Sequence, residues 1–195
     1  MIYLSICIPA VFERFSPDLY DELRRQITAG GLDGQVEILA LFDNRQRSLG
    51  RKRNDLLSAA NGKYVTHLDD DDWIAPNYCA DIVEAIVSNH EPGLIAFDSE
   101  VTLNGGNPFR VVTAIDANNE PPVQVGGLWQ TITRQPWNWC AWRRDLCVAF
   151  PDQTNGEDWE WVRRMLIRIH SHVKLDKVLH YYRYNNATSV ADGMP

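Results

Sequence analysis

Apolar runs alternate with segments of helical periodicity along the first half of the chain, and this order restricts the possible folds more than any other feature. The apolar runs are typical of strands buried on both faces, and they cover residues 2–9, 36–42, 63–68 and 93–98. Segments with helical spacing of their apolar residues separate these runs, at 16–31, 48–62 and 75–90. Because a helix between two strands favours a right-handed crossover, residues 1–98 are predicted to form a parallel sheet flanked by helices.

The helix predicted for residues 16–31 has a start and a stop signal. Ser16 suits the N-cap and Pro17 suits the first helical position. Gly30 and Gly31 form a typical stop.

The second half of the chain has a less regular pattern. Residues 101–115 predict two short strands around an Asn-Gly-Gly turn, and residues 117–127 form a loop rich in Pro, Gly and Asn. Helices are predicted for residues 142–150 and 157–170, and a strand for residues 178–184. The chain contains no internal repeat or low-complexity run, so a single domain over residues 1–195 is predicted.

Composition limits the class of protein. A length of 195 residues, with 45% hydrophobic and 23% charged residues, suits one soluble α/β domain. The formal net charge of −7 excludes a global basic field for nucleic acid or anionic membranes. The apolar N-terminus has no basic start and contains Pro9, so a strand is predicted there, and no membrane span is expected. Four scattered cysteines favour free thiols and a cytoplasmic location.

Polar or special residues follow three of the predicted strands. Pro9 and Ala10 end the first, Asp43 follows the second, and four aspartates, 69–72, follow the third. In an open parallel sheet, ligands bind beyond these strand ends. Because neighbouring carboxylates repel one another, a site for Mg²⁺ or Mn²⁺ explains the aspartates better than an exposed acidic loop or a helix start. An EF-hand loop and a phosphate-binding P-loop are excluded, because neither pattern is present.

Five motifs resemble those of glycosyltransferase family 2 in order and spacing, over nearly the whole chain. They are "SICIPA", "ILALFDN", "RKRNDLLSAANGKYVTHLDDDDWIAP", "NGEDWEWVRRML" and "LHYYRYNNATS". The resemblance implies a GT-A fold, which is a Rossmann-like, mostly parallel sheet flanked by helices. It also implies inverting, metal-dependent sugar transfer from a nucleotide-sugar donor, most often a UDP-sugar. Residues 1–98 would then bind the nucleotide sugar, and residues 99–195 would supply the acceptor and catalytic half.

The resemblance assigns donor-binding roles to residues near the first two strand ends. Pro9 and Ala10 would contact the nucleotide base, although Thr is usual at the position of Ala10. Asp43 would bind the base or ribose, unless it is only a turn aspartate. Arg53 matches the family's Arg-Asn pair and lies in the basic run 45–53, which could neutralise the donor diphosphate. A solvated helix face and a surface that tracks nucleic-acid phosphates remain alternatives for this run.

Within the four aspartates, Asp69 and Asp71 match the family's DxD motif. Asp69 would hold the ribose or a metal-bound water, and Asp71 would bind Mn²⁺ or Mg²⁺. Asp70, at the variable position, is grouped with the donor-binding residues, and Asp72 takes the following acidic position. A bound dication would offset the repulsion among these carboxylates.

The resemblance places the catalytic acids in the fourth motif. Asp158 matches the base that takes the acceptor proton, and Glu157 would orient the site. The alternative is that both are only favourable acids at a helix N-terminus. His180 and Arg183, in the last motif, match groups that reach the metal or the diphosphate, although a strand histidine is more often structural.

The acceptor is predicted from the segment around four tryptophans, 129, 137, 139 and 142. Their rings suit a saccharide, but they also suit the stacked bases of DNA, with Arg134, Arg143 and Arg144 close by in the sequence. Two or more of them could instead belong to the core. A saccharide acceptor is favoured, with a hydroxylated DNA base as the alternative. A non-catalytic module that binds nucleotide or metal is the rival from another class.

Overall fold

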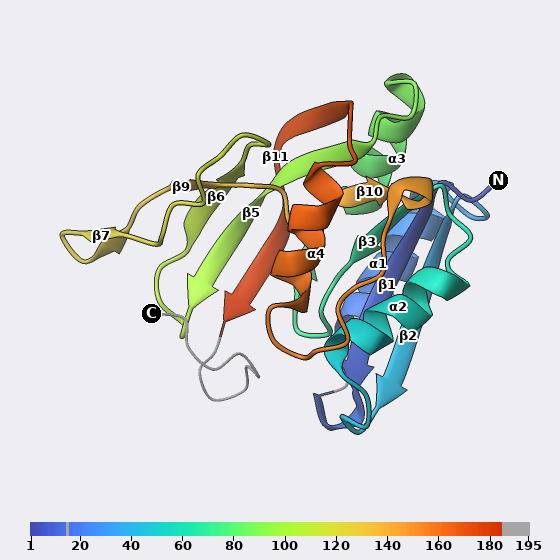
Figure 1. Cartoon of the computed structure of the whole chain (residues 1–195), viewed down its shortest axis with the longest axis horizontal. Helices are drawn as coiled ribbons and strands as arrows, with labels where there is room; N and C mark the ends of the chain where they lie inside the picture. The colour runs from blue at the N-terminus through green and yellow to red at the C-terminus, as the bar shows by residue number, and fades with distance from the viewer. Residues whose placement is uncertain (15, 185–195) are drawn as a thin grey trace.

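The computed structural model describes residues 1–14 and 16–184 (Figure 1). The helices in this part of the chain are α1 (Asp18–Ala29), α2 (Leu49–Ala59), α3 (Tyr78–Ser88) and α4 (Glu157–Leu166). The strands are β1 (Leu4–Val11), β2 (Val36–Asp43), β3 (Tyr64–His67), β4 (Trp73–Ile74), β5 (Leu94–Leu103), β6 (Phe109–Thr113), β7 (Gln124–Val125), β8 (Leu128–Trp129), β9 (Ile132–Arg134), β10 (Ala141–Arg143) and β11 (His172–Tyr184). Short 3-10 helices cover Phe12–Arg14 and Arg144–Leu146.

One large sheet runs through the described residues in the order β2-β1-β3-β10-β5-β11-β4; β6 also pairs with β5, and β9 pairs with β6. β1 pairs in parallel with β2 and β3, and β11 pairs in parallel with β5. β10 runs antiparallel between β3 and β5. The predicted α/β class with flanking helices is confirmed. Because β10 lies after residue 98 in the chain, the two predicted halves share this sheet.

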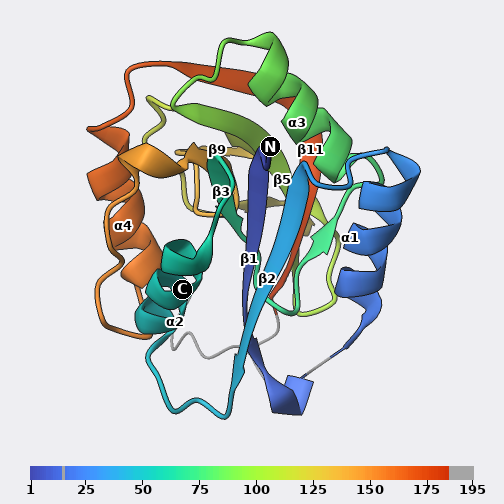
Figure 2. The ribbon, with the colours of Figure 1, turned by 90° about the vertical axis from the view of Figure 1, so that its right-hand side faces the viewer.

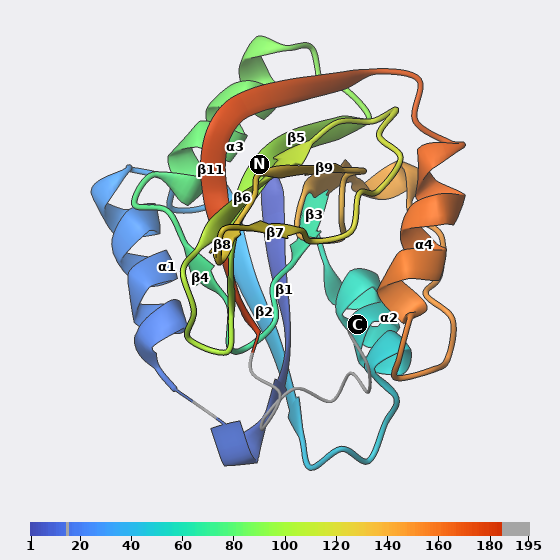
Figure 3. The same cartoon turned by 90° about the vertical axis from the view of Figure 1, so that its left-hand side faces the viewer.

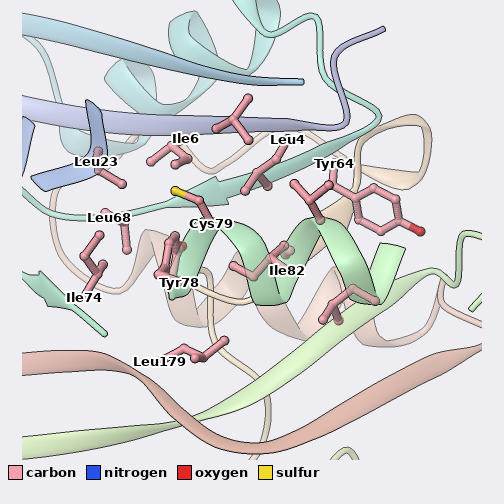
Figure 4. Close-up of a cluster of buried hydrophobic side chains, with 14 of the residues drawn as sticks. Leu4, Ile6, Leu23, Tyr64, Leu68, Ile74, Tyr78, Cys79, Ile82 and Leu179 are labelled. Atoms are coloured by element: carbon pink, nitrogen blue, oxygen red, sulfur yellow. The ribbon is translucent and has the colours of Figure 1, made fainter. Parts of the chain in front are cut away.

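Helices cover both faces of the sheet (Figures 2 and 3). α1 and α3 lie on one face, where Leu23 and Ile82 join a cluster with Leu4 and Ile6 of β1 (Figure 4). α2 and α4 lie on the other face, where the fully buried Trp161 belongs to a second cluster. Burial of these apolar faces is the main favourable term in holding the layers together.

The structure corrects the helix predicted for residues 142–150. This segment contains the end of β10, a 3-10 turn and an irregular stretch. The Trp142 side chain is fully buried, and its backbone pairs with both β3 and β5. A three-residue strand is too short to show a detectable alternation of apolar and polar residues. The helix-like composition of the segment was therefore misleading.

Three smaller predictions also need adjustment. β2 was expected to be buried on both faces, but it is the edge strand of the sheet and is mostly half-buried. Pro17, and not Ser16, is the N-cap of α1, although the Ser16 hydroxyl still accepts the Asp18 backbone N–H. The helix predicted to reach residue 170 ends at Leu166. The turn predicted near the Asn-Gly-Gly sequence is confirmed, because β5 and β6 form an antiparallel pair around it.

No helix in the described ranges is both long and apolar enough to cross a membrane.

Candidate active site

A cleft of about 470 Å³ lies where the ends of β1 and β3 meet the start of α4. Its walls combine basic residues from the β2–α2 region, carboxylates from the end of β3, and the first turn of α4. The lining residues are Pro9, Val11, Arg45, Arg47, Leu49, Lys52, Arg53, Asp69, Asp71, Thr154, Asn155, Gly156, Glu157, Asp158, Tyr182 and Arg183. The cleft therefore brings together Asp69 and Asp71, expected to bind donor and metal, and the expected catalytic acids Glu157 and Asp158.

The four consecutive aspartates divide into two kinds. Asp69 and Asp71 line the cleft. Asp70 and Asp72 are buried, and each accepts a backbone N–H: Asp70 Oδ2 from Val11 at 3.0 Å, and Asp72 Oδ2 from Asp69 at 2.9 Å. Asp70 thus fastens this loop to the end of β1, which differs from the donor contact expected of it. Asp70 and Asp72 therefore hold the loop in its conformation, whereas Asp69 and Asp71 line the cleft.

Arg53 links the two groups of acids. Its guanidinium is 1% exposed, and Nη2 lies 2.9 Å from Asp69 Oδ1 while Nε lies 3.3 Å from Glu157 Oε1. The packing of this guanidinium over the Phe150 ring, at 5.9 Å, adds a cation–π contact. Nη1 is buried and has no hydrogen-bond partner among residues 1–14 and 16–184. Arg53 is therefore held between the β3 loop and α4, and Nη1 could donate to a ligand or water.

Of the residues expected to bind the nucleotide base, Pro9 lines the cleft, whereas Ala10 and Asp43 contact Lys52, which is another lining residue. Lys52 is 4% exposed, and its Nζ contacts Asp43 Oδ1 at 2.9 Å and the Ala10 carbonyl at 3.1 Å. Burial opposes ionisation of Asp43, but Lys52 and the backbone N–H groups of Arg45 and Arg47 together hold its pKa below the ordinary value. The ends of β1 and β2 are therefore tied together by an ionised pair.

Gly156 is the N-cap of α4, immediately before the acids expected to be catalytic. Gly156 has φ +75°, a left-handed conformation that glycine adopts without strain. α4 then begins with Glu157 and Asp158. Asp158 Oδ2 accepts the indole N–H of Trp137 at 3.0 Å, and Oδ1 accepts the Trp159 backbone N–H at 2.7 Å. The carboxylate expected to act as base is thus held by both of its oxygens.

Two acids in the site have raised pKa values. Burial raises the pKa of Glu157 to about 7, against the opposing effect of Arg53. Burial also raises the pKa of Asp69; Arg53 opposes this shift, and the neighbouring Asp72, Asp158 and Asp70 reinforce it. Glu157 is 2% exposed, so an acceptor reaches Asp158 more readily than Glu157.

His180 and Arg183, both on β11, have different surroundings. His180 is fully buried, with Nε2 3.0 Å from Asp72 Oδ2 and Nδ1 3.2 Å from Ser99 Oγ. Nδ1 is hydrogen-bonded to Ser99, whereas Nε2 lies near Asp72 but has no hydrogen-bond partner among residues 1–14 and 16–184. Binding of a metal by His180 stays a prediction. Arg183 lines the cleft and places its guanidinium 5.9 Å from the Trp73 ring centroid. Residues 185–189 of the last motif lie outside the described residues.

The tryptophans of the expected acceptor segment separate into three environments. Trp142 is a core residue, and Trp129 packs on Phe109 with ring centroids 5.6 Å apart. Trp137 and Trp139 are half-buried and lie near the acids: Trp137 through its bond to Asp158, and Trp139 by stacking on His180 at 4.5 Å. Only part of the expected acceptor segment therefore belongs to the site.

The carboxylates present fit a divalent cation that is shared with a substrate. Among residues 1–14 and 16–184, no group of three or more His, Cys, Asp or Glu side chains is placed to hold a metal ion. However, Mg²⁺ and Mn²⁺ need only one or two protein carboxylates where substrate phosphates and water complete the coordination. Asp69 and Asp71, on one wall of the cleft, supply such a pair.

Comparison with solved structures shows which class of protein has this fold. S. aureus TarS 1–349 in complex with UDP-GlcNAc matches with a TM-score of 0.66 and 16% identity, covering 97% of this chain and 62% of that one. A longer S. aureus TarS structure matches with a TM-score of 0.63 and 16% identity, covering 94% of this chain and 37% of that one. The shared architecture confirms the predicted GT-A fold.

Sequence comparison then shows the family. The family model described as Glycosyl transferase family 2 matches residues 13–114, which is more than half of the chain. The chain belongs to this family. The Bacillus subtilis (strain 168) protein EpsH, named as a glycosyltransferase, is 31% identical over 64 residues, which are 33% of this chain and 16% of EpsH. The chain thus spans less than two thirds of EpsH and of both TarS chains.

Sequence reasoning missed two contacts that shape the site. Lys52 was grouped in the basic run, but its bridge between Asp43 and Ala10 depends on the pairing of β1 with β2. The bond from Trp137 to Asp158 joins residues 21 positions apart, on a loop and a helix. No local pattern in the sequence signals either contact.

Proposed function

We propose that this chain transfers a sugar from a nucleotide-sugar donor to an acceptor hydroxyl, with inversion and with a divalent metal. One observation carries the proposal: a single cleft joins Asp69 and Asp71, a set of basic side chains, and Asp158. Carboxylates paired with a metal and basic groups suit a donor diphosphate, and a separate held carboxylate suits the attacking hydroxyl. Membership of the family agrees with this activity.

The donor is proposed to be a UDP-sugar. Two S. aureus TarS structures with the same fold are described as complexes with UDP and with UDP-GlcNAc. In this chain, Lys52 with its partner Asp43, and the exposed Arg45 and Arg47 that line the cleft, provide groups for a nucleoside and a diphosphate. Residues 1–98 would then form the donor half, and residues 99–195 the catalytic and acceptor half.

In the proposed reaction, Asp158 accepts the proton of the acceptor hydroxyl while its oxygen attacks the anomeric carbon. The bond from that carbon to the diphosphate oxygen breaks, and its electron pair leaves with the nucleotide diphosphate. Because an aspartate is a weak base, its correct positioning supplies much of the rate acceleration. Arg53 holds the β3 loop and α4 in fixed relation. Asp69 and Asp71 would hold the cation, which when bound would stabilise the charge that develops on the leaving diphosphate.

A saccharide is proposed as the acceptor, in preference to a DNA base. Trp137 and the 38% exposed Trp159 flank Asp158, and aromatic faces of this kind suit sugar rings. The arginines that would be needed to follow a DNA backbone are engaged elsewhere. Arg134 donates to the Glu120 carbonyl, Arg143 to Asp145, and Arg144 to the Gly62 carbonyl.

Donor hydrolysis tests the proposal without knowledge of the acceptor. A panel of nucleotide sugars is incubated with Mn²⁺, and slow release of nucleotide diphosphate is measured. We expect one donor class to be hydrolysed, with Asp158→Asn reducing turnover but not donor binding. Failure to release diphosphate from any donor, with or without saccharide acceptors, would favour a non-catalytic binding module. Acceleration by hydroxymethylated DNA, but not by saccharides, would identify the base as the acceptor.

A further inference from the structure

The carboxylate of Asp158 is held by a side chain from a different part of the fold. Trp137 lies in the loop between β9 and β10, whereas Asp158 lies in the first turn of α4. Their side chains meet through the 3.0 Å bond from the indole Nε1–H to Oδ2. The other oxygen, Oδ1, accepts the adjacent backbone N–H of Trp159 at 2.7 Å.

This contact acts against the normal tendency of an acid in a helix's first turn. The first backbone N–H groups of a helix lack partners within the helix, and they attract nearby carboxylates. A carboxylate drawn to them with both oxygens would turn away from the cleft. The indole N–H gives Oδ2 a second, fixed partner, so the two oxygens of Asp158 face different groups.

Trp137 is itself held firmly enough to position a neighbour. Its ring packs between Trp139 and Trp159, with centroids 5.9 and 5.6 Å away. Its carbonyl accepts the indole N–H of Trp142 at 2.9 Å. Because Trp142 is fully buried in β10, a continuous set of contacts leads from the centre of the sheet to the carboxylate.

We propose that Trp137 is a positioning residue for the catalytic carboxylate of Asp158, acting through its indole N–H. The inference rests on the proposed function, because it requires Asp158 to be the base. If the base is displaced by a fraction of an ångström, much of the rate acceleration that comes from its fixed position is lost. The indole therefore affects the chemical step, and it does not affect donor binding.

Two substitutions separate the N–H group from the bulk of the ring. Trp137→His keeps a ring N–H at the position of the indole nitrogen, because imidazole matches the five-membered part of indole, but it loses the second ring. Trp137→Phe keeps an aromatic ring and loses the donor. Trp129→Phe is the matched control, since Trp129 packs on Phe109, away from the cleft.

The experiment measures the release of nucleotide diphosphate by donor hydrolysis in the presence of Mn²⁺, together with donor affinity and Tm. We expect Trp137→Phe to lower kcat about tenfold or more with unchanged KM and donor affinity. Trp137→His should retain more of kcat than Trp137→Phe, although it packs less well. In the Asp158→Asn background, Trp137→Phe should cause no further loss, because the group that it positions is absent.

Several results would overturn the inference. If Trp137→Phe keeps full kcat while Trp137→His loses it, the ring acts through packing alone. If both variants lose kcat and donor affinity equally, the residue supports the cleft as a whole. If Asp158→Asn hydrolyses the donor as fast as the wild type, the proposed function itself fails, and the role of Trp137 fails with it.

Discussion

Arg53 places a positive charge where almost no water reaches it. Two carboxylates, Asp69 and Glu157, share this one guanidinium, and Asp69 is 35% exposed on the cleft side. Removing the partner of a buried ion lowers the stability of the fold strongly, whereas an exposed ion pair contributes little to that stability. The stability of the chain and the geometry of its cleft are therefore both expected to depend on this residue.

Removing the Arg53 charge should destabilise the protein strongly. We expect Arg53→Met to lower the free energy of unfolding by about 3–5 kcal/mol at pH 8, because Glu157 is left buried and unpaired. Urea unfolding gives the value. Arg47→Met is the matched control, since the Arg47 pair with Asp55 is 46% exposed on each side and its loss should cost less than about 1 kcal/mol. Equal effects of the two substitutions would contradict the bridging role.

Glu157 should make stability depend on pH. Its pKa in the folded chain, about 7, lies above its ordinary value of 4.5, so its proton is bound more tightly in the folded state. The stabilising contribution is complete below about pH 4.5 and is lost as pH rises through about 7. We expect the stability of the wild type relative to Glu157→Gln to fall by on the order of 1–3 kcal/mol between pH 5 and 8.

Urea unfolding in metal-free buffer measures this difference at each pH. The control is Glu160→Gln in the same helix: its side chain is 42% exposed and pairs with the solvent-accessible Arg164, so the change should alter stability by less than about 1 kcal/mol. A constant or rising advantage of the wild type over Glu157→Gln with pH would contradict the expected ionisation of Glu157.

At the level of elements, α2 packs closely against the segment before α4. The Gly50 backbone N–H, in the first turn of α2, donates to the Gln153 carbonyl at 2.9 Å. A Cβ atom on Gly50 would lie 1.8 Å from the Pro151 carbonyl oxygen. The absence of a side chain at this position allows the loop that precedes Glu157 to approach the helix.

Replacing Gly50 with alanine should therefore reverse the usual effect of that substitution. Alanine in a helix normally gains about 1 kcal/mol over glycine. Here we expect Gly50→Ala to cost about 1–3 kcal/mol and to lower donor turnover, because the loop before α4 must move. Ser58→Ala, at an exposed position of the same helix, should be neutral or slightly stabilising. Thermal unfolding and the hydrolysis assay check both variants, and a more stable Gly50→Ala would refute the close fit.

The elements show which features are predictable from sequence. β1, β3 and the four helices were found because their apolar residues recur at regular spacing over several positions. β10 was missed because its three residues derive their strand conformation from β3 and β5. The same holds for the site: the acids 69, 71, 157 and 158 lie in motifs, whereas the Arg53–Glu157 contact spans 104 positions. Local patterns carry no information on such distant partners.

At the scale of the whole molecule, binding of donor and metal should stabilise the fold. A ligand that binds only the folded state at 100 times its Kd adds about 2.7 kcal/mol, which is roughly 5–10 °C in Tm for a chain of this size. We expect UDP with Mn²⁺ to give such a shift, and Asp71→Ala to abolish the part that depends on Mn²⁺. Asp176→Ala is the control, because Asp176 is 95% exposed and lies outside the cleft. An equal Mn²⁺-dependent shift in Asp71→Ala would exclude metal binding by Asp71.

The position of β10 has a consequence for the order in which the chain folds as it is made. A nascent chain leaves the ribosome from its N-terminus, so β1, β2 and β3 can pair early. β5 cannot join them until Ala141–Arg143 has emerged, because β10 fills the space between β3 and β5. Until then, β3 and β5 each present an open edge to other chains. A translation pause before Ala141 would therefore prolong the interval in which this protein depends most on chaperones.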